Sequence, residues 1–252
     1  MDTDKGILYV ATGERYVEEA ILSSESFRRN MPDIPQAIFL DTRKHFGHGE
    51  DQLFDLVEEL SNAEYSFLDK MRPLKDSPFK KTLFIDTDCY SVNPCYEIFD
   101  LLETYELAAV RAVFRGMHES EVCPECFPQF NTGVIAYRNN QIVHGFFAEW
   151  IRRYEEMYRN AEGYCSDQPP FQDTVYGSAV RLAVLPNEYN LHVGWPNLVA
   201  GMAKVKILHG RGVMLRRAID ELEAHPTAFL PRMVWFSNHE ELEQIFGKQI
   251  YE

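Results

Sequence analysis

Two aspartates, Asp86 and Asp88, stand one residue apart directly after an apolar run in the stretch KKTLFIDTDCY (80–90). Carboxylate oxygens are hard ligands that suit Mg²⁺ or Mn²⁺, and such ions usually complete their shell with substrate phosphates and water. In a strand, residues i and i+2 point to the same side, so both carboxylates could face one point in space. The pair also fits two other interpretations, a solvated strand end and the nucleophile motif of a phosphatase.

The residues around the two aspartates help to separate these interpretations. A phosphatase of the haloacid dehalogenase type carries D-x-D-x-T/V just inside the N-terminus, normally with glycine after the second aspartate. Here Cys89 and Tyr90 follow, and the motif lies a third of the way along the chain. The run 81–86 predicts a buried strand, and ligands of open α/β sheets bind at the carboxyl ends of strands. The sequence therefore favours a metal-binding pair over the phosphatase motif.

Short apolar runs alternate with amphipathic segments through the first half of the chain. Strands are expected at 6–12, 36–41 and 81–86, and helices at 16–30, 50–62, 67–78 and 96–104. This alternation is typical of βαβ units around a largely parallel sheet. In the second half, strands are expected at 106–114, 130–138, 181–186 and 203–210, and helices at 142–160, 215–225 and 239–247. We predict one α/β domain over 1–252, with a nucleotide-binding first half (1–105) and a less regular second half (106–252).

The composition is ordinary for a soluble globular protein and limits the partners. Of the 252 residues, 45% are hydrophobic and 25% charged, and no apolar run approaches the roughly 18 residues that span a bilayer. The acidic start MDTDKGILYVATG resembles neither a signal nor a transit peptide, so a cytoplasmic location is expected. The net charge of −14, from 39 acidic and 25 basic residues, argues against nucleic acid as a partner.

Six motifs in a fixed order carry a family resemblance. T-x-x-x-Y follows the first strand, and a lysine, D-x-D, N-x-G, D-Q and H-x-x-G come after it, within about residues 6–215. This order resembles the glycogenin-like and galactosyltransferase-like retaining glycosyltransferases. The resemblance implies a single GT-A (Rossmann-like) domain with a mostly parallel central sheet flanked by helices. It also implies a metal-dependent hexosyltransferase that moves a sugar from a nucleoside diphosphate donor, a UDP-sugar, to a carbohydrate, lipid or protein acceptor with retention of configuration.

The resemblance assigns the base of the donor to the loop after the first strand. Ala11 and Thr12 would contact the base through the backbone and Tyr16 through its ring, because an aromatic face stacks on any flat base. The family's Asn-Asp pair is replaced by Gly13-Glu14 in this loop. Tyr16 is equally compatible with a plain first-turn position in an amphipathic helix.

The resemblance assigns further residues to the donor phosphates, the metal and the sugar. Lys70, 16 residues before Asp86, matches a lysine that contacts the donor phosphates. Asp86, Asp88 and His209 match the three ligands of Mn²⁺ (or Mg²⁺), and Asp86 would also face the donor. Asn131, in FNTGV, matches an asparagine that hydrogen-bonds the sugar or the acceptor.

The expected catalytic residues lie in CSDQPPF. Asp167 and Gln168 match the family's D-Q pair, which lies beside the anomeric carbon. A carboxylate or an amide dipole at that place would stabilise the positive charge of an oxocarbenium-like sugar. An aspartate before Pro-Pro is also typical of a helix N-cap, and the two roles are compatible.

The chain departs from the family pattern after H-x-x-G. Gly212 matches the glycine of that motif, which is assigned to the donor site, but the position of the family's diphosphate-gripping lysine, in Lys-Pro-Trp, is Leu215. Arg211, Arg216 and Arg217 are candidates to supply the cation instead, since a guanidinium binds phosphate bidentately. Of the three, Arg211 is assigned to the donor site.

Two other functions stay open at this point. A nucleotidyltransferase would carry a Gly-rich loop after the first strand, where ATGERYVEEA has only one glycine. A sugar-nucleotide or glycan-binding module without turnover is favoured by the missing Lys-Pro-Trp. Binding of UDP with Mn²⁺ in the absence of donor hydrolysis would distinguish the module from the enzyme.

Overall fold

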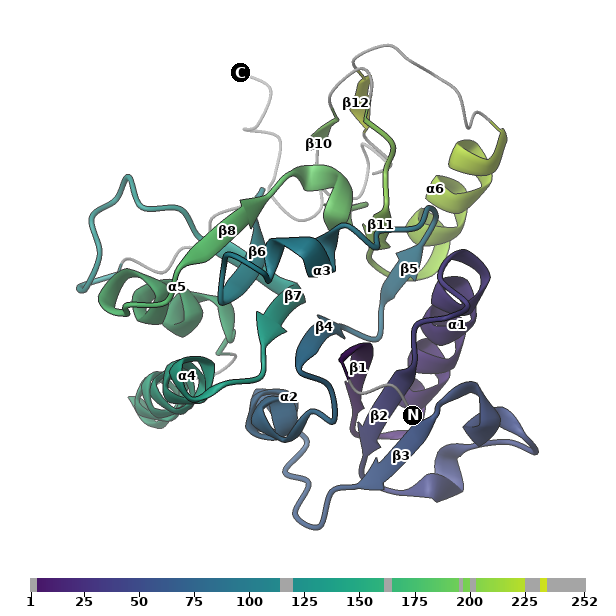
Figure 1. The fold of residues 1–252 in the computed structure, drawn as a ribbon, viewed down its shortest axis with the longest axis horizontal. Coiled ribbons are helices and arrows are strands. Elements are labelled where there is room, and N and C mark those ends of the chain that lie inside the picture. Colours follow the sequence, from purple (N-terminus) through teal and green to yellow (C-terminus); the bar gives the residue numbers. More distant parts are fainter. Residues whose placement is uncertain are drawn as a thin grey trace.

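A seven-stranded sheet forms the centre of the molecule (Figure 1). The computed structural model describes residues 4–113, 120–160, 165–194, 197–199, 203–224 and 232–234. The strands of the sheet, in spatial order, are β3 (Leu56–Glu59), β2 (Gln36–Leu40), β1 (Lys5–Ala11), β4 (Lys81–Ile85), β7 (Phe130–Arg138), β6 (Leu107–Arg111) and β8 (Leu182–Leu185). Neighbouring strands are parallel except where β7 pairs with β4 and β6. The predicted α/β class with a mostly parallel sheet is confirmed.

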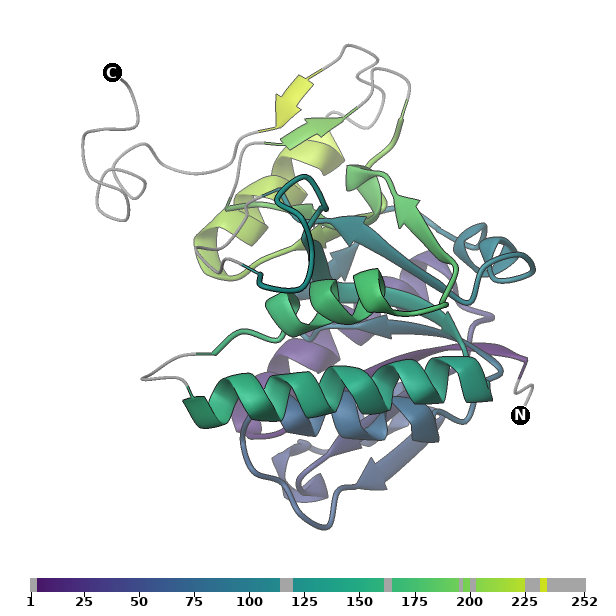
Figure 2. The same ribbon diagram turned by 90° about the vertical axis from the view of Figure 1, so that its left-hand side faces the viewer.

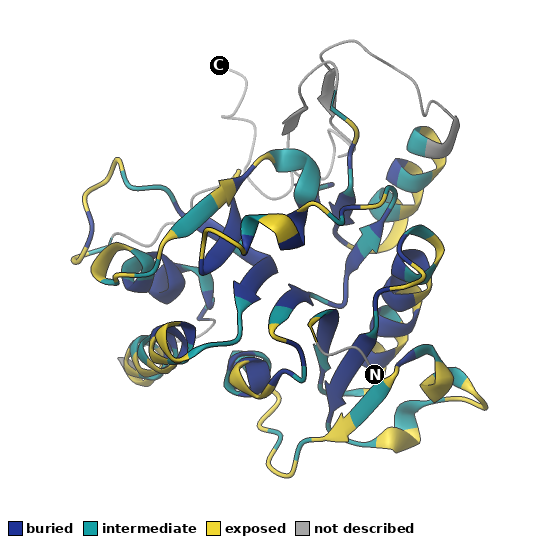
Figure 3. Ribbon diagram, viewed as in Figure 1, coloured by how far each residue is buried: buried dark blue, intermediate teal, exposed yellow. Residues whose placement is uncertain are grey.

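Helices cover both faces of the central sheet. One face carries α1 (Glu14–Asn30) and α3 (Ile98–Leu101), and the other carries α2 (Phe67–Met71), α4 (Gln141–Asn160) and α5 (Gln168–Gly177). Residues of β1 alternate between the two layers, with Ile7 and Tyr9 in the first core and Leu8 in the second. The long helix α4 crosses the face seen in Figure 2, and the central strands are buried along most of their length in Figure 3. The sheet is thus a rigid support for the segments that leave its carboxyl edge.

Two smaller sheets complete the structure. The first joins β5 (Cys89–Ser91), β11 (Ile207–His209) and β9 (Leu191–His192), and α6 (Gly212–Ala224) packs against it. The second pairs β10 (Asn197–Val199) with β12 (Arg232–Val234). Because only three residues (86–88) separate β4 from β5, the three-stranded sheet lies next to the aspartates that follow β4.

The prediction of a helix over 50–62 is wrong. Glu50–Leu53 form one short 3₁₀ turn, and Leu56–Glu59 are the edge strand β3, parallel to β2. The apolar spacing of this segment is compatible with a helix. In the structure Phe54, which is only 5% exposed, packs in the core against Tyr9 of β1 and lies between the 3₁₀ turn and the strand. The free edge of β2 supplies backbone partners to Leu56–Glu59, and this tertiary pairing overrides the local pattern.

Smaller differences concern where elements begin and end. The segment 67–78 forms α2 and then a 3₁₀ turn over Arg72–Asp76, in line with the break expected at its prolines. The last helix in the described part, α6, begins at Gly212, three residues before the predicted start. The helix expected at 239–247 lies outside the described residues. No helix among the described residues is long and apolar enough to cross a membrane.

Candidate active site

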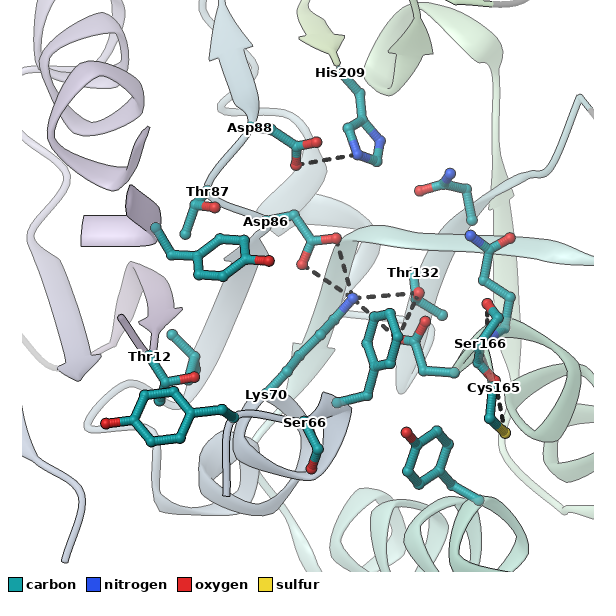
Figure 4. Close-up of a pocket in the computed structure, with 18 of the residues that line it drawn as sticks. Thr12, Ser66, Lys70, Asp86, Thr87, Asp88, Thr132, Cys165, Ser166 and His209 are labelled. Carbon is teal, nitrogen blue, oxygen red and sulfur yellow. Dashed lines mark hydrogen bonds and ion pairs between the residues drawn. The ribbon is translucent and has the colours of Figure 1, made fainter. Parts of the chain in front are cut away.

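A cavity of about 730 Å³ opens at the carboxyl ends of β1 and β4 (Figure 4). It is lined by ten of the residues singled out in the sequence: Thr12, Tyr16, Lys70, Asp86, Asp88, Asn131, Asp167, Gln168, His209 and Arg211. The other two expected residues, Ala11 and Gly212, are not among the lining residues: Ala11 is buried in β1, and Gly212 is the first residue of α6. The cavity receives side chains from both halves of the chain.

The two aspartates leave β4 in a turn. β4 ends at Ile85, and the N–H of Cys89 donates to the carbonyl of Asp86 (3.1 Å). The N–H of Asp86 donates to the carbonyl of Gly133 on β7 (2.7 Å), which fixes the start of the turn. The expected alternation along a strand is therefore not what directs the two carboxylates, although both line the cavity. Each of them is paired with a different cation.

Asp86 belongs to a buried cluster around the ammonium of Lys70. Nζ of Lys70 lies 3.0 Å from carboxylate oxygens of both Asp86 and Asp167 and 3.3 Å from Oγ1 of Thr132. The hydroxyl of Thr132 donates to Asp167 (2.8 Å). Burial acts to lower the pKa of Lys70, but the carboxylates of Asp167 and Asp86 outweigh it, and the net shift is upward. Lys70 is therefore a buried ammonium held by two carboxylates.

Asp88 faces an imidazole and a guanidinium. Its Oδ1 lies 3.3 Å from Nε2 of His209, and its Oδ2 lies 3.1 Å from a guanidinium nitrogen of Arg211. Burial acts to raise the pKa of Asp88, but His209 and then Arg211 outweigh it and hold that pKa well below its ordinary value. Burial likewise acts to lower the pKa of His209, and Asp88 turns the net shift upward.

His209 is placed by strand pairing and by a glycine. β11 runs antiparallel to β5 with His209 opposite Cys89, and the N–H of Gly210 donates to the carbonyl of Asp88 (3.0 Å). The ring then lies against Gly133 of β7, where an added Cβ would stand 2.4 Å from Cε1 of His209. Only glycine leaves room for the imidazole at this point of the N-x-G motif.

The carboxylate of Asp167 points into the cavity and does not cap its helix. Asp167 is the N-cap residue of α5, but its side chain makes no capping hydrogen bond. It points to Lys70 and Thr132, and it is only 2% exposed. The indole N–H of Trp150 donates to the carbonyl of Asp167 (2.8 Å), so α4 holds this residue in place. Gln168, the first residue of α5, also lines the cavity.

The loop between β1 and α1 forms another wall. Gly13 adopts a φ of 104°, and its N–H donates to Asp41 (3.0 Å) at the end of β2. Tyr16, in the first turn of α1, is 43% exposed and lines the cavity with Thr12. The guanidinium of Arg211 lies 5.8 Å from the centre of its ring. Tyr16 thus occupies the expected first-turn position of α1 and also lines the cavity.

Among the three candidate arginines, only Arg211 lines the cavity. Its guanidinium pairs with Glu19 of α1 (2.9 Å) as well as with Asp88. Arg216 and Arg217 are exposed on α6, and Leu215 packs in the small core beneath that helix. The motif order did not reveal Glu19 or Thr132. Thr132 could have been found as the middle residue of N-T-G, but Glu19 carries no local signal.

A divalent cation fits the residues around Asp88. Oδ1 of Asp88 is buried and has no hydrogen-bond partner within the described part of the chain, although it faces Nε2 of His209. One oxygen and one nitrogen ligand are therefore directed at the same space. Atoms of Asp88, Cys89 and His209 that could bind a metal lie within 4.8 Å of one another. Burial strongly raises the pKa of the Cys89 thiol, which disfavours the thiolate that would bind a metal. Asp86, the remaining expected ligand, is held by Lys70.

Comparison with known proteins gives matches at the level of structure. No protein-family model matches the sequence, and no curated protein is significantly similar to it. The glycosyltransferase GlyE of Streptococcus pneumoniae TIGR4 superposes with a TM-score of 0.62 at 14% identity, covering 91% of this chain and 66% of that one. The galactosyltransferase LgtC, solved in complex with donor and acceptor sugar analogs, gives 0.58 at 13% identity and covers 95% and 99%.

The bifunctional glycosyltransferase WbbM gives a TM-score of 0.54 at 17% identity, covering 84% of this chain and 46% of that one. The chain thus spans just under two thirds of GlyE and under half of WbbM, but nearly the whole of LgtC. At such identities the likeness establishes the fold, which is a glycosyltransferase fold of the GT-A type. The predicted fold family is confirmed.

Proposed function

We propose that the chain is a metal-dependent hexosyltransferase that moves a sugar from a nucleoside diphosphate donor, a UDP-sugar, to an acceptor with retention of configuration, in the cytoplasm. One observation carries this proposal. In a glycosyltransferase fold, the pair of Asp88 and His209 and the cluster of Asp86, Lys70 and Asp167 line one cavity at the carboxyl edge of the sheet. Carboxylates, an imidazole and a buried ammonium in one cavity suit a metal-bound diphosphate.

Asp86, Asp88 and His209 would hold Mn²⁺ or Mg²⁺. When bound, the ion supplies a Lewis acid that offsets the negative charge developing on the departing nucleotide. Lys70 pairs with Asp86 and Arg211 with Asp88, and both cations would donate to the phosphate oxygens of the donor. Arg211 would then replace the lysine that the family carries in Lys-Pro-Trp.

The remaining assignments are those that the family resemblance implies, and the side chains of Thr12, Tyr16, Asp167, Gln168 and Asn131 line the cavity. Thr12 and Tyr16 would take the base, with Ala11 supplying backbone behind them in β1. Asp167 and Gln168 would lie beside the anomeric carbon, where a negative carboxylate and an amide dipole stabilise an oxocarbenium-like sugar. Asn131 would hydrogen-bond the sugar or the acceptor.

The experiment is a calorimetric titration of UDP with and without Mn²⁺, together with an assay of UDP-sugar hydrolysis. The wild-type protein should bind UDP more tightly with Mn²⁺ and hydrolyse or transfer the sugar only when the metal is present. Asp88→Asn should lose the metal-dependent activity, because one of its two oxygen ligands becomes an amide nitrogen. Asp100→Asn, the same change on the exposed side of α3, should leave activity at the wild-type level.

Three results would redirect the assignment. Full activity in excess EDTA would rule out the metal scheme. UDP binding with Mn²⁺ but without any turnover would support the alternative, a sugar-nucleotide-binding module. Absence of any nucleotide binding would count against both.

A further inference from the structure

Two asparagines, the half-buried Asn131 and the buried Asn190, connect β7 to the ring of His209. The backbone N–H of Gly133 donates to Oδ1 of Asn131 (2.8 Å), and Nδ2 of Asn190 donates to the same oxygen (2.8 Å). Oδ1 of Asn190 lies 2.9 Å from Nδ1 of His209. Asn190 is 3% exposed and His209 is 8% exposed, so bulk water does not compete strongly for these contacts. The chain of contacts runs from β7 through two amides to the imidazole.

The donors and acceptors along this chain can be arranged in one way only. A backbone N–H can only donate, so the atom of Asn131 that it meets is the carbonyl oxygen. That oxygen can only accept, so the atom of Asn190 that meets it is the amide nitrogen. The other end of Asn190 is then a carbonyl oxygen, which needs a donor from Nδ1 of His209. A backbone group thus decides the amide orientations that coordinates alone leave ambiguous.

The consequence falls on the other ring nitrogen. A neutral imidazole carries one proton, and with that proton on Nδ1 the lone pair is on Nε2. Nε2 faces Oδ1 of Asp88 at 3.3 Å, and this oxygen has no hydrogen-bond donor among the described residues. Two electron-rich atoms that face each other in a buried place suit a cation between them. Groups that hold the second nitrogen of a metal-binding histidine typically fix its tautomer and orientation.

We propose that Asn131 and Asn190 are positioning residues that hold His209 in the Nδ1–H tautomer and so present Nε2, beside Asp88, to a divalent cation. The inference rests on the proposed function for the identity of the ligand, but the tautomer itself does not depend on it. Gly133 has two parts in this arrangement. Its N–H orients Asn131, and its lack of a side chain leaves room for the ring of His209.

The neighbouring histidine provides an internal reference. His192 pairs with His209 between β9 and β11, and their ring centres lie 5.0 Å apart. The backbone N–H of Gly194 donates to Nδ1 of His192 (3.2 Å), so the neutral ring carries its proton on Nε2. Two adjacent imidazoles in one cavity are therefore expected to have opposite tautomers. Nε2 of His209 is the ring nitrogen that faces Asp88, at 3.3 Å.

The test combines NMR spectroscopy of the histidine rings with Mn²⁺ calorimetry. Protein labelled with ¹⁵N in its histidine rings gives long-range ¹H–¹⁵N patterns that distinguish the tautomers at alkaline pH, where the rings are neutral. His209→Gln and His192→Gln assign the two signals. In the wild type, His209 should show the Nδ1–H pattern and His192 the Nε2–H pattern. In Asn190→Ala, His209 should shift towards Nε2–H, and the dissociation constant for Mn²⁺ should rise about 10–100-fold.

Asn93→Ala is the matched control. Asn93 donates from Nδ2 to the carbonyl of Val205 (2.7 Å), just before β11, and makes the same kind of support without touching His209. It should leave the tautomer and the Mn²⁺ affinity unchanged. If Asn190→Ala does not fold, the wild-type spectrum still decides, because an Nε2–H pattern for His209 would overturn the proposal.

A wild-type Mn²⁺ affinity in folded Asn190→Ala would also overturn the positioning role, while leaving the proposed metal site intact. Conversely, wild-type protein that binds no Mn²⁺, with or without UDP, would refute the proposed metal site. In that case the proposed presentation of Nε2 to a cation falls with it, even if the Nδ1–H tautomer is observed. The two failures are therefore distinguishable.

Discussion

Replacing Lys70 by methionine tests the buried cluster at the base of the cavity. Methionine keeps an unbranched stem of four heavy atoms, with sulfur in place of Cδ, and lacks the ammonium. The change leaves the carboxylates of Asp86 and Asp167 without the cation that both contact at 3.0 Å, and it removes a contact to Thr132 at 3.3 Å. The side chain of Asp167 is 3% exposed and that of Asp86 is 26% exposed, so water can solvate the unpaired carboxylate only at Asp86.

The expected cost is large for one side chain. At an effective dielectric constant of about 20, each contact at 3.0 Å corresponds to roughly 5–6 kcal/mol of attraction. Desolvation of each ion offsets several kcal/mol of this, and breaking a buried pair from one side typically costs about 3–5 kcal/mol. We expect Lys70→Met to lower the free energy of unfolding by about 3–5 kcal/mol, or the melting temperature by about 6–20 °C.

The assay is urea unfolding followed by circular dichroism at neutral pH, with Lys75→Met as the control. Lys75 is 53% exposed and pairs with the equally exposed Asp76, so its loss should cost about 0–1 kcal/mol. Burial raises the pKa of Asp86 even beside Lys70, and without the ammonium its protonated form is favoured further. A folded-state pKa above the unfolded value adds stability at low pH, so the deficit should shrink as the pH falls. A deficit no larger than that of Lys75→Met would refute the buried ion cluster.

Two further predictions use matched pairs. Gly133→Ala places a Cβ 2.4 Å from Cε1 of His209, so we expect the free energy of unfolding to fall by about 1–3 kcal/mol and Mn²⁺ binding to weaken. Gly145 is an exposed residue of α4 with open space around its Cα, so Gly145→Ala should stabilise the protein by about 0.5–1 kcal/mol. Equal effects of the two in urea unfolding and calorimetry would contradict this packing. Arg211→Gln should raise the dissociation constant of UDP with Mn²⁺ about 10–100-fold, because a charge-assisted contact is lost, while exposed Arg216→Gln should not. Unchanged UDP affinity in Arg211→Gln would remove that residue from the donor site.

The elements that the sequence predicted best are those with the strongest burial signal. FNTGVIAYR matches β7 (Phe130–Arg138) residue for residue, and the aromatic helix over 142–160 is α4 with one residue added. The strand is marked by the continuous apolar run 134–137, and the helix by aromatic side chains at helical spacing. The prediction for 50–62 was wrong because the apolar residues of this segment fit both the helical and the strand period. Pairing with the edge of β2, another part of the chain, decides for the strand.

The candidate site divides in a similar way. Ten of the twelve residues expected in the site line one cavity, so the order of the motifs was a good guide to which residues come together. Their roles stay predictions, since no ligand contact tests them. The hydrogen-bond and ion-pair partners of these residues could not be predicted from the sequence. Nothing in the spacing of the motifs indicates that Thr132 bridges Lys70 and Asp167, because the three come from β7, α2 and the start of α5.

The meeting of Asp88 with His209 shows why separation along the chain is a poor guide to this site. Asp88 lies in the turn between β4 and β5, and His209 follows 121 residues later in a strand of only three residues. What joins them is the antiparallel register of β11 on β5, which sets His209 opposite Cys89 and lets Gly210 donate to the carbonyl of Asp88. A one-residue slip would turn the imidazole to the other face of the sheet. Register is a property of two strands together, so the D-x-D motif becomes a site only when the second half of the chain has folded against the first.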